Sequence, residues 1–447
     1  MTTIAIHNGR VIDPALGQDG IADVVIVGGR IARVGPGEGD AVIDAERIDA
    51  TGLVVAPGFV DLHTHLREPG QEHKETIATG TAAAARGGYT TVCAMPNTTP
   101  ALDSRPAVES VLREADATGR VRVLPIGAIT MGRQGKELTP QGELRNAGVV
   151  ALSDDGDAVA DASLMRHALE YSTQFAMPVA QHCEDPSLVR DGQMHEGWVA
   201  TRLGLRGRPA SAEETMVARD IALAELVGAH LHICHVSTAG SVALIAAARE
   251  RGAHITAEVT PHHLTLTHEE VAFDGDYVHL RYDTNAKVNP PLREEADLEA
   301  LTAALRDGVI DAIATDHAPH ASTDKDIEFD LASPGLTMLE TAFGLSMRLV
   351  HQGRLTLPTL IERMSIGPVR AWGLDALEGL QGLGTLAPGA LGDVTLLDPD
   401  AEWTVDPAAF ASKGKNTPLG GRTLKGMVVA TIYGGALVHE TERIVAL

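Results

Sequence analysis

The chain has few cysteines, and their placement limits the sites that they could form. Only three of its 447 residues are cysteines, Cys93, Cys183 and Cys234, and each lies in an apolar run far from the others. An odd number of widely spaced cysteines is typical of reduced thiols in a cytoplasmic protein. No CxxC pair is present, which argues against a zinc site built from cysteines. We therefore expect a cytoplasmic protein with free thiols.

Basic residues and long apolar stretches are also scarce. Lysine and arginine number 36 against 60 acidic residues, and the net charge of −24 argues against nucleic acid or an anionic membrane as partner. No run of roughly twenty apolar residues occurs, so we expect no membrane span. Residues 1–11 lack a basic region followed by an apolar core, so we expect no signal peptide. A small anionic substrate stays possible, because one arginine can hold a carboxylate.

The two ends of the chain share one pattern. Alternating apolar and polar residues, broken by Gly, Asp and Pro, predict short strands in segments 3–13, 22–35, 41–45, 392–405 and 426–440. Neither end is long enough to form a good core alone, so we expect the two ends to pack together. We assign residues 1–55 and 380–447 to one composite β-sandwich domain.

The middle of the chain, residues 56–379, follows a different pattern. Eight apolar, strand-like runs occur at 53–65, 89–98, 121–130, 148–156, 177–185, 229–237, 253–263 and 309–320. Most are separated by segments with Ala, Leu and Glu at helical spacing, such as 75–88, 161–175, 212–228 and 239–252. Eight strands alternating with helices predict a parallel (β/α)8 barrel, with a doubly wound sheet as the alternative. Because nearly every strand ends in His, Asp, Asn or Arg, and a barrel gathers these ends at one mouth, we favour the barrel.

Metal-ligand residue types recur at these strand ends. His63 and His65 are two residues apart, so their side chains share one side of an ideal strand. An HxH pair alone is a weak signal, but His182, His235 and Asp316 end three later strands. All five are good zinc ligands, and buried polar groups need a common partner. The set exceeds what one tetrahedral zinc requires, so two zinc ions are favoured over one.

Two zinc ions need an anion between them. The strand at 148–156 ends with Asp154 and Asp155, either of which could supply a bridging carboxylate. A carboxylated lysine is the other common solution in related barrels, but no lysine occurs between Lys136 and Lys287. We prefer Asp155 as the bridge and assign Asp154 a supporting or loop-capping role.

Other histidines near these strand ends are not assigned as ligands. His230 and His232 are an odd number of residues from His235 and share its strand side only imperfectly. His262 and His263 follow the seventh strand, where core or supporting roles are favoured over ligation, and His317 should point away from its neighbour Asp316.

Eight motifs together resemble a known family. PGFVDLHTHLREPG, MPNTTP, SDDG, HCED, HVST, EVTPHHL, NPPLR and ATDHAPH occur in this order. As a set they are highly specific, and the chain resembles the dihydroorotase family of the longer bacterial type, within the amidohydrolase superfamily, over essentially all of its length. The resemblance implies zinc-dependent, reversible cyclisation of N-carbamoyl-L-aspartate to L-dihydroorotate in pyrimidine biosynthesis.

The resemblance also implies roles for individual residues. One zinc is held by His63 and His65, the other by His182 and His235, Asp155 bridges them, and Asp316 binds metal and moves the proton. The implied substrate-binding residues are His65, Arg67, Asn97, Asn289, His320, Pro334 and Gly335, the last two through their backbone. The forked guanidinium of Arg67 suits the carboxylate of dihydroorotate, whereas a surface salt bridge is the alternative reading.

Two other functions stay open as alternatives. Hydantoinase, dihydropyrimidinase and allantoinase share the fold and the HxH pair, but their usual lysine bridge is absent here, and the resemblance places Arg67 with dihydroorotases. A catalytically silent dihydroorotase-like subunit that scaffolds aspartate transcarbamoylase would have lost ligands, and this set is intact. The resemblance suggests a homodimer or a complex with aspartate transcarbamoylase.

Overall fold

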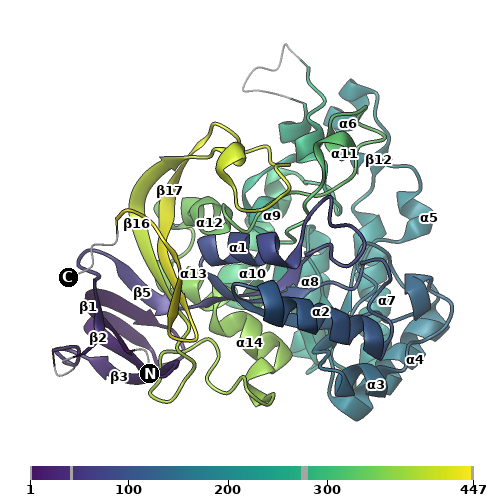
Figure 1. Ribbon diagram of the computed structural model, residues 1–447. Coiled ribbons are helices and arrows are strands. Elements are labelled where there is room, and N and C mark those ends of the chain that lie inside the picture. Colours follow the sequence, from purple (N-terminus) through teal and green to yellow (C-terminus); the bar gives the residue numbers. More distant parts are fainter. Residues whose placement is uncertain (1–2, 41–43, 273–279, 444–447) are drawn as a thin grey trace.

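The computed structural model describes residues 3–40, 44–272 and 280–443 (Figure 1). Of the predicted strand at 41–45, residues 41–43 lie outside these ranges. Within the described ranges, no helix combines the length and the apolar character needed to cross a membrane.

An eight-stranded parallel sheet confirms the predicted barrel. Its strands pair in chain order and each overlaps one of the eight predicted runs: β6 (Phe59–Thr64), β7 (Tyr89–Ala94), β8 (Arg122–Gly127), β9 (Ala151–Leu152), β10 (Val179–Gln181), β13 (Leu231–Ile233), β14 (Ile255–Val259) and β15 (Ala312–Ile313). The first and last strands meet where the backbone N–H of His65 donates to the His317 carbonyl at 2.9 Å. The ends of all eight strands therefore surround one mouth.

Helices follow the strands and cover the outside of the barrel. The four predicted helical segments correspond to α1 (Ile77–Arg86), α4 (Ala162–Ser172), α7 (Ser211–Val227) and α8 (Ala239–Glu250). The Thr76 and Thr238 side chains cap the first turns of α1 and α8, and α7 ends at Gly228 with a positive φ, as helix-terminating glycines do. The other α-helices are α2 (Arg105–Thr118), α3 (Gln141–Asn146), α5 (Pro186–Val189), α6 (Trp198–Leu203), α9 (Pro261–Thr265), α10 (Glu295–Asp307), α11 (Ser322–Lys325), α12 (Ala342–His351), α13 (Leu357–Met364) and α14 (Ile366–Trp372).

The two ends of the chain share a second, separate sheet. Figure 1 shows the purple N-terminal strands beside the yellow C-terminal strands, on the left of the helices that surround the barrel. The sheet order is β18-β17-β16-β5-β1-β2-β3, with β4 paired to β1. The bounds are β1 (Thr3–Asp13), β2 (Gln18–Val27), β3 (Arg30–Gly35), β4 (Glu46–Asp49), β5 (Val54–Pro57), β16 (Val394–Thr404), β17 (Thr423–Tyr433) and β18 (Ala436–Glu440). A small pair, β11 (Met194–His195) and β12 (Gly207–Arg208), lies in the long connection between β10 and β13.

Candidate active site

The end of β6 brings the HxH pair against the end of β15. Nε2 of His65 lies 3.0 Å from Oδ1 of Asp316, and Nε2 of His63 lies 3.5 Å from the same oxygen. All three side chains are buried. We call His63, His65 and Asp316 the HxH group.

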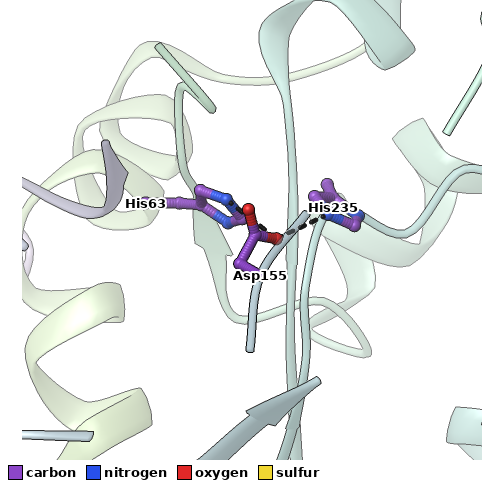
Figure 2. Close-up of side chains that lie close together, drawn as sticks. All are labelled: His63, Asp155 and His235. Carbon is purple, nitrogen blue, oxygen red and sulfur yellow. Dashed lines mark hydrogen bonds and ion pairs between the residues drawn. The ribbon is translucent and has the colours of Figure 1, made fainter. Parts of the chain in front are cut away.

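A second pair of histidines lies beside this group. Nδ1 of His182, after β10, lies 2.9 Å from Nε2 of His235, after β13. Asp155 stands between His63 of the HxH group and His235 (Figure 2). Its Oδ1 lies 3.4 Å from the ring nitrogens of His63, His182 and His235, and its Oδ2 lies 3.4 Å from Nε2 of His65. The preferred aspartate is therefore the one that reaches both sets of histidines.

The donor set fits a divalent metal. Ligands bonded tetrahedrally to zinc lie about 3.4 Å from one another, which matches these separations. Two buried carboxylates, Asp155 and Asp316, face this cluster of imidazoles, and buried charges require compensation. Burial by itself would raise the pKa of Asp155, but His63, His182 and His235 hold it well below its ordinary value. Asp155 is thus an anion, as a metal between the two sets would require.

Cys234 also approaches His63 but does not suit ligation. Its thiol, a carboxylate oxygen of Glu258 and a ring nitrogen of His63 all lie within 4.8 Å of one another. Burial raises the pKa of the Cys234 thiol above its ordinary value, which disfavours the thiolate that a metal would bind. A protonated thiol is a poor metal ligand.

Polar side chains behind the histidines orient their rings. Nδ1 of His63 lies 2.6 Å from Oε1 of Glu258, on β14, and Nδ1 of His65 lies 2.9 Å from Oδ1 of Asn97. Nε2 of His182 lies 3.3 Å from Oε2 of Glu184. Such partners fix which ring nitrogen carries the proton and leave the other free for a metal. The sequence contained Glu258 in EVTPHHL and Glu184 in HCED, but their role behind a histidine depends on the packing of neighbouring strands.

Two aspartates near the cluster accept hydrogen bonds from backbone N–H groups. Oδ1 of Asp61 accepts hydrogen bonds from the backbone N–H groups of His63 and Thr315, both at 3.0 Å, and so ties β6 to β15. Burial raises the pKa of Asp61 to about 7. Oδ1 of Asp154 accepts from the backbone N–H groups of Ile129, at 2.8 Å, and Thr130, at 3.0 Å. Asp154 therefore fixes the loop after β8 and does not face the histidines.

One cavity contains every predicted substrate-binding residue. It measures about 190 Å³ and opens beside the metal-ligand cluster. Its lining residues are His65, Arg67, Asn97, Asp155, Gly156, His182, Val288, Asn289, Asp316, Ala318, His320, Ser333, Pro334 and Gly335. Gly156, Val288, Ala318 and Ser333 were not predicted, because small and apolar lining residues carry no chemical signal in a sequence.

Arg67 lies buried in this cavity rather than on the surface. Its Nε donates to the Pro319 carbonyl at 3.2 Å, and one terminal nitrogen lies 3.4 Å from Nε2 of His320. That His320 nitrogen lies closer to the Pro334 carbonyl, at 2.9 Å, to which it donates. Burial lowers the pKa of Arg67 to about 10, so the guanidinium stays cationic at neutral pH. Neither of its partners is a carboxylate, and it can bind an anion that enters the cavity.

Three predicted site residues have strained backbone. Arg67, His235 and Asp316 have φ values of 62°, 33° and 45°. Side chains other than glycine rarely adopt this left-handed region, and such strain concentrates at functional sites. The turns that end β6, β13 and β15 are thus shaped to aim these side chains at the mouth.

The remaining histidines near the mouth make other contacts. His263 bonds with Thr260 at 2.8 Å and donates to the Pro290 carbonyl at 3.0 Å. Nδ1 of His317 accepts from the backbone N–H of Met338 at 3.1 Å, which turns its ring from the cavity. The buried ring of His262 has no hydrogen-bond partner within the described ranges.

Comparisons with known proteins agree with this geometry. Residues 52–241 match the family model described as dihydro-orotase-like. The chain is 53% identical to the dihydroorotase of Anaeromyxobacter dehalogenans and 52% identical to that of Pelotomaculum thermopropionicum, covering 98% of both chains in each comparison.

Among solved structures, it is similar to a dihydropyrimidinase from Brevibacillus agri, with a TM-score of 0.85 and 25% identity over 99% of this chain and 96% of the other. An L-hydantoinase from Arthrobacter aurescens shares the fold, with a TM-score of 0.85 and 24% identity over 100% and 98%. The fold is thus common to several cyclic amidohydrolases, whereas the high sequence identity is to dihydroorotases. The chain belongs to the dihydroorotase family.

Proposed function

We propose that this protein is a zinc-dependent dihydroorotase, which interconverts L-dihydroorotate and N-carbamoyl-L-aspartate in pyrimidine biosynthesis. The observation that carries the proposal is the buried, cationic Arg67 in the same cavity as Asp316 and the histidine cluster. Dihydroorotate carries a carboxylate beside its cyclic amide, and the cavity offers one cation and one set of metal ligands to receive these two groups.

Two zinc ions are favoured over one. The HxH group would hold the first, the His182–His235 pair the second, and Asp155 would contact both. When bound, zinc supplies a Lewis acid for the ring carbonyl and makes hydroxide available at neutral pH. The family resemblance also supports a cytoplasmic homodimer or a complex with aspartate transcarbamoylase, which light scattering of the purified chain, alone and with that enzyme, would test.

The protein's own residues would bind the substrate and move one proton. Arg67 would pair with the substrate carboxylate, assisted by Asn289, His320 and the Pro334–Gly335 backbone. Oδ1 of Asn289 is a buried atom with no hydrogen-bond partner within the described ranges, so it is free to accept one from a ring N–H. Asp316 would take the proton from the attacking hydroxide as its oxygen bonds to the ring carbon, and would deliver it to the nitrogen as the C–N bond breaks.

The specificity for a carboxylate tests this function. A buried guanidinium facing an uncharged ring stays unpaired, which costs on the order of a few kcal/mol. The protein should therefore prefer dihydroorotate over dihydrouracil, hydantoin and allantoin by orders of magnitude in kcat/KM, and Arg67→Met should reduce the dihydroorotate reaction by at least about 100-fold. Arg122→Met is a matched control, because Arg122 pairs with Asp393 at 2.8 Å and does not line the cavity.

The same measurements separate this function from its alternatives. Equal efficiency of the unmodified protein on dihydrouracil and dihydroorotate would favour a dihydropyrimidinase. Absence of turnover in the metal-loaded protein would favour a silent subunit.

A further inference from the structure

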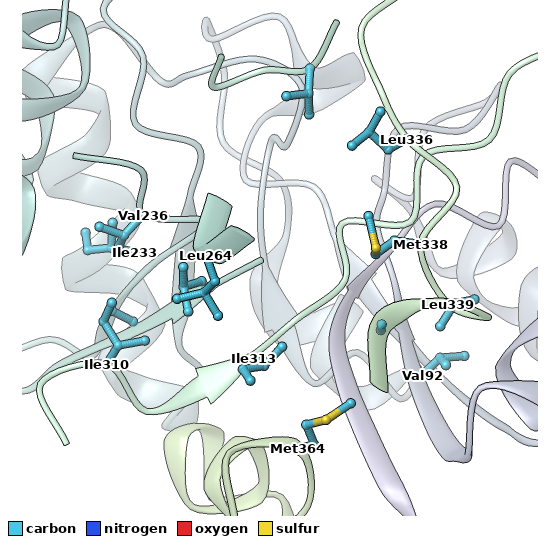
Figure 3. Packing of buried hydrophobic residues seen from close by; sticks show 14 of the residues in the cluster. Val92, Ile233, Val236, Leu264, Ile310, Ile313, Leu336, Met338, Leu339 and Met364 are labelled. Atoms are coloured by element: carbon cyan, nitrogen blue, oxygen red, sulfur yellow. The ribbon is translucent and has the colours of Figure 1, made fainter. Parts of the chain in front are cut away.

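A column of polar side chains extends from the metal-ligand cluster into the inside of the barrel. Thr256 and Glu258 are two apart on β14, and His230 and His232 are two apart at β13, so each pair shares one face of its strand. His232 and Thr256 are also paired in register across the two strands. The neighbouring Ile233 belongs to the large apolar cluster shown in Figure 3, which lies on the opposite face. We call Glu258, His232, Thr256 and His230 the interior column.

The inner face of such a barrel is normally filled by branched apolar side chains. Elsewhere on the inside of this barrel, Cys93, Ile126, Ala151, Ala180 and Ala312, from five strands, form one cluster that is apolar, as this rule requires, although most of its side chains are small. The column departs from it, although Glu258 and His232 are fully buried. Buried polar groups destabilise a fold unless they are hydrogen-bonded, so this departure needs an explanation in contacts or in function.

Continuous contacts join the column to the ligand His63. Oε1 of Glu258 lies 2.6 Å from Nδ1 of His63, and Oε2 of Glu258 lies 3.2 Å from Nε2 of His232. Nδ1 of His232 lies 2.9 Å from the Thr256 hydroxyl, which lies 2.8 Å from Nε2 of His230. The edge of the Trp372 ring system packs against His232, with ring centroids 5.4 Å apart, and limits movement of its imidazole.

With neutral imidazoles, one arrangement of protons satisfies every contact. A carboxylate only accepts, so Nδ1 of His63 and Nε2 of His232 must both carry hydrogen. Nδ1 of His232 is then a lone pair that accepts the Thr256 hydroxyl proton, and the Thr256 oxygen accepts from Nε2 of His230. Each link has one donor and one acceptor. The column therefore defines the tautomer of His63, whose Nε2 lone pair faces Asp155 and Asp316.

We propose that the interior column positions His63 for metal binding, with His232 and Thr256 acting through Glu258. Glu258 also approaches the second half of the cluster, because its Oε1 accepts from the backbone N–H of His235 at 3.4 Å. A carboxylate held by His232 cannot turn from these two contacts. The inference rests on the proposed metal site and adds positioning residues, His232 and Thr256, that lie beyond the direct partners of the ligands.

Metal affinity tests the column without relying on turnover. The full-length protein is stripped by a chelator and reloaded with Zn²⁺ or Co²⁺, and the metal Kd is measured by chelator competition together with the visible spectrum of the cobalt form. Loss of a partner behind a metal ligand weakens metal binding roughly 10–100-fold. We expect His232→Leu to fall at the lower end of that range, with an altered cobalt spectrum. His232→Gln, whose amide can donate to Glu258 from the position of Nε2, should restore most of the affinity.

Two further variants make the test decisive. Thr256→Val keeps the shape of the side chain but removes the hydroxyl that fixes the His232 tautomer, and should also weaken metal binding. His7→Leu is the matched control, because His7 is a buried histidine of the terminal sheet.

The proposal would be overturned if His232→Leu and Thr256→Val both had native circular dichroism and bound metal with the wild-type Kd. If His232→Leu does not fold, the metal Kd of Thr256→Val decides alone. If the unmodified protein bound no metal, the proposed function would fail and the column's role with it. If the unmodified protein bound metal and both variants bound it with the same Kd, the proposed function would stand and only the column's role would be rejected.

Discussion

The HxH group and the His182–His235 pair differ in how their rings are held. In the HxH group, both histidines have close partners, Glu258 at 2.6 Å from His63 and Asn97 at 2.9 Å from His65. In the other pair, Glu184 lies 3.3 Å from His182, and the buried Nδ1 of His235 has no hydrogen-bond partner within the described ranges. One half of the cluster is thus more firmly organised than the other.

The backbone repeats this difference. The HxH group stands on β6 and β15, which Asp61 ties together through two backbone hydrogen bonds of 3.0 Å. His182 and His235 follow β10 and β13 much as His65 and Asp316 follow β6 and β15, and each half has a ligand candidate with a positive φ, His235 at 33° and Asp316 at 45°. The difference in the backbone therefore lies in the Asp61 contacts. Ligands that are oriented before binding lose less entropy and bind metal more tightly. Two metal ions in this cluster should therefore be held with unequal strength.

Removing one ligand from each half gives the largest expected effect. His63→Ala should lower turnover of dihydroorotate by about 1,000-fold or more, because it removes a ligand from the firmly held half and leaves Glu258 buried without this partner. His235→Ala should also lower turnover but should retain one tightly bound metal ion per chain. The measurements are kcat and metal content after dialysis, with circular dichroism to show that both variants fold. If His63→Ala and His235→Ala lost the same amount of metal, the two halves of the cluster would not differ in the strength of metal binding.

The sequence predicted the fold well because the relevant signals are local. Apolar runs and helical spacing identified all eight barrel strands, including β9, which has only two residues in regular pairing. The exchange of strands between the two chain ends followed from their shared pattern, since neither end could bury a core alone. What the pattern could not supply was the pairing of β5 with both β1 and β16, which joins the two ends into one sheet.

Predicted site residues also came together, whereas their supports were largely missed. His63, Asp155 and His235 carry a signal because each is a ligand type at the end of a strand. Glu258 carries none by itself, since its meaning depends on a contact with β6, 195 positions away in the chain. His232 was assigned no site role because its spacing from His235 is odd, and the positive φ of His235 explains why that spacing misleads. A strained turn changes the direction of a side chain, and alternation along an ideal strand cannot predict it.

The carboxylate between the two halves gives the next largest effect. Asp155→Ala removes the contact that both halves share, so metal binding should weaken in both and kcat should fall by at least about 100-fold. Asp154→Ala should instead leave the Ile129 and Thr130 N–H groups unpaired, costing about 1–3 kcal/mol of unfolding free energy with a smaller loss of kcat. Because no lysine lies between Lys136 and Lys287, added bicarbonate should not change the activity. A greater loss of metal in Asp154→Ala than in Asp155→Ala would show that the wrong aspartate has been assigned.

Glu184 supports His182 in the weaker half, and its substitution should have the smallest effect. Oε2 of Glu184 lies 3.3 Å from Nε2 of His182 and 3.0 Å from Arg208, and although burial would raise the pKa of Glu184, His182 and Arg208 hold it at about 2. The group is therefore a carboxylate at any working pH. It accepts a hydrogen bond from Nε2 of His182, which leaves Nδ1 of His182 free for a metal. Glu184→Gln keeps the shape but removes the charge, so the weaker metal site should lose roughly 10-fold in affinity while the tight site is unchanged. Titration of the apo protein with Zn²⁺ by calorimetry resolves the two binding steps, and Glu299→Gln, at an exposed glutamate outside the cavity and outside every candidate metal group, serves as the control. If only the tighter step lost affinity, Glu184 would support the tighter site, and the assignment of that site to the HxH group would be wrong.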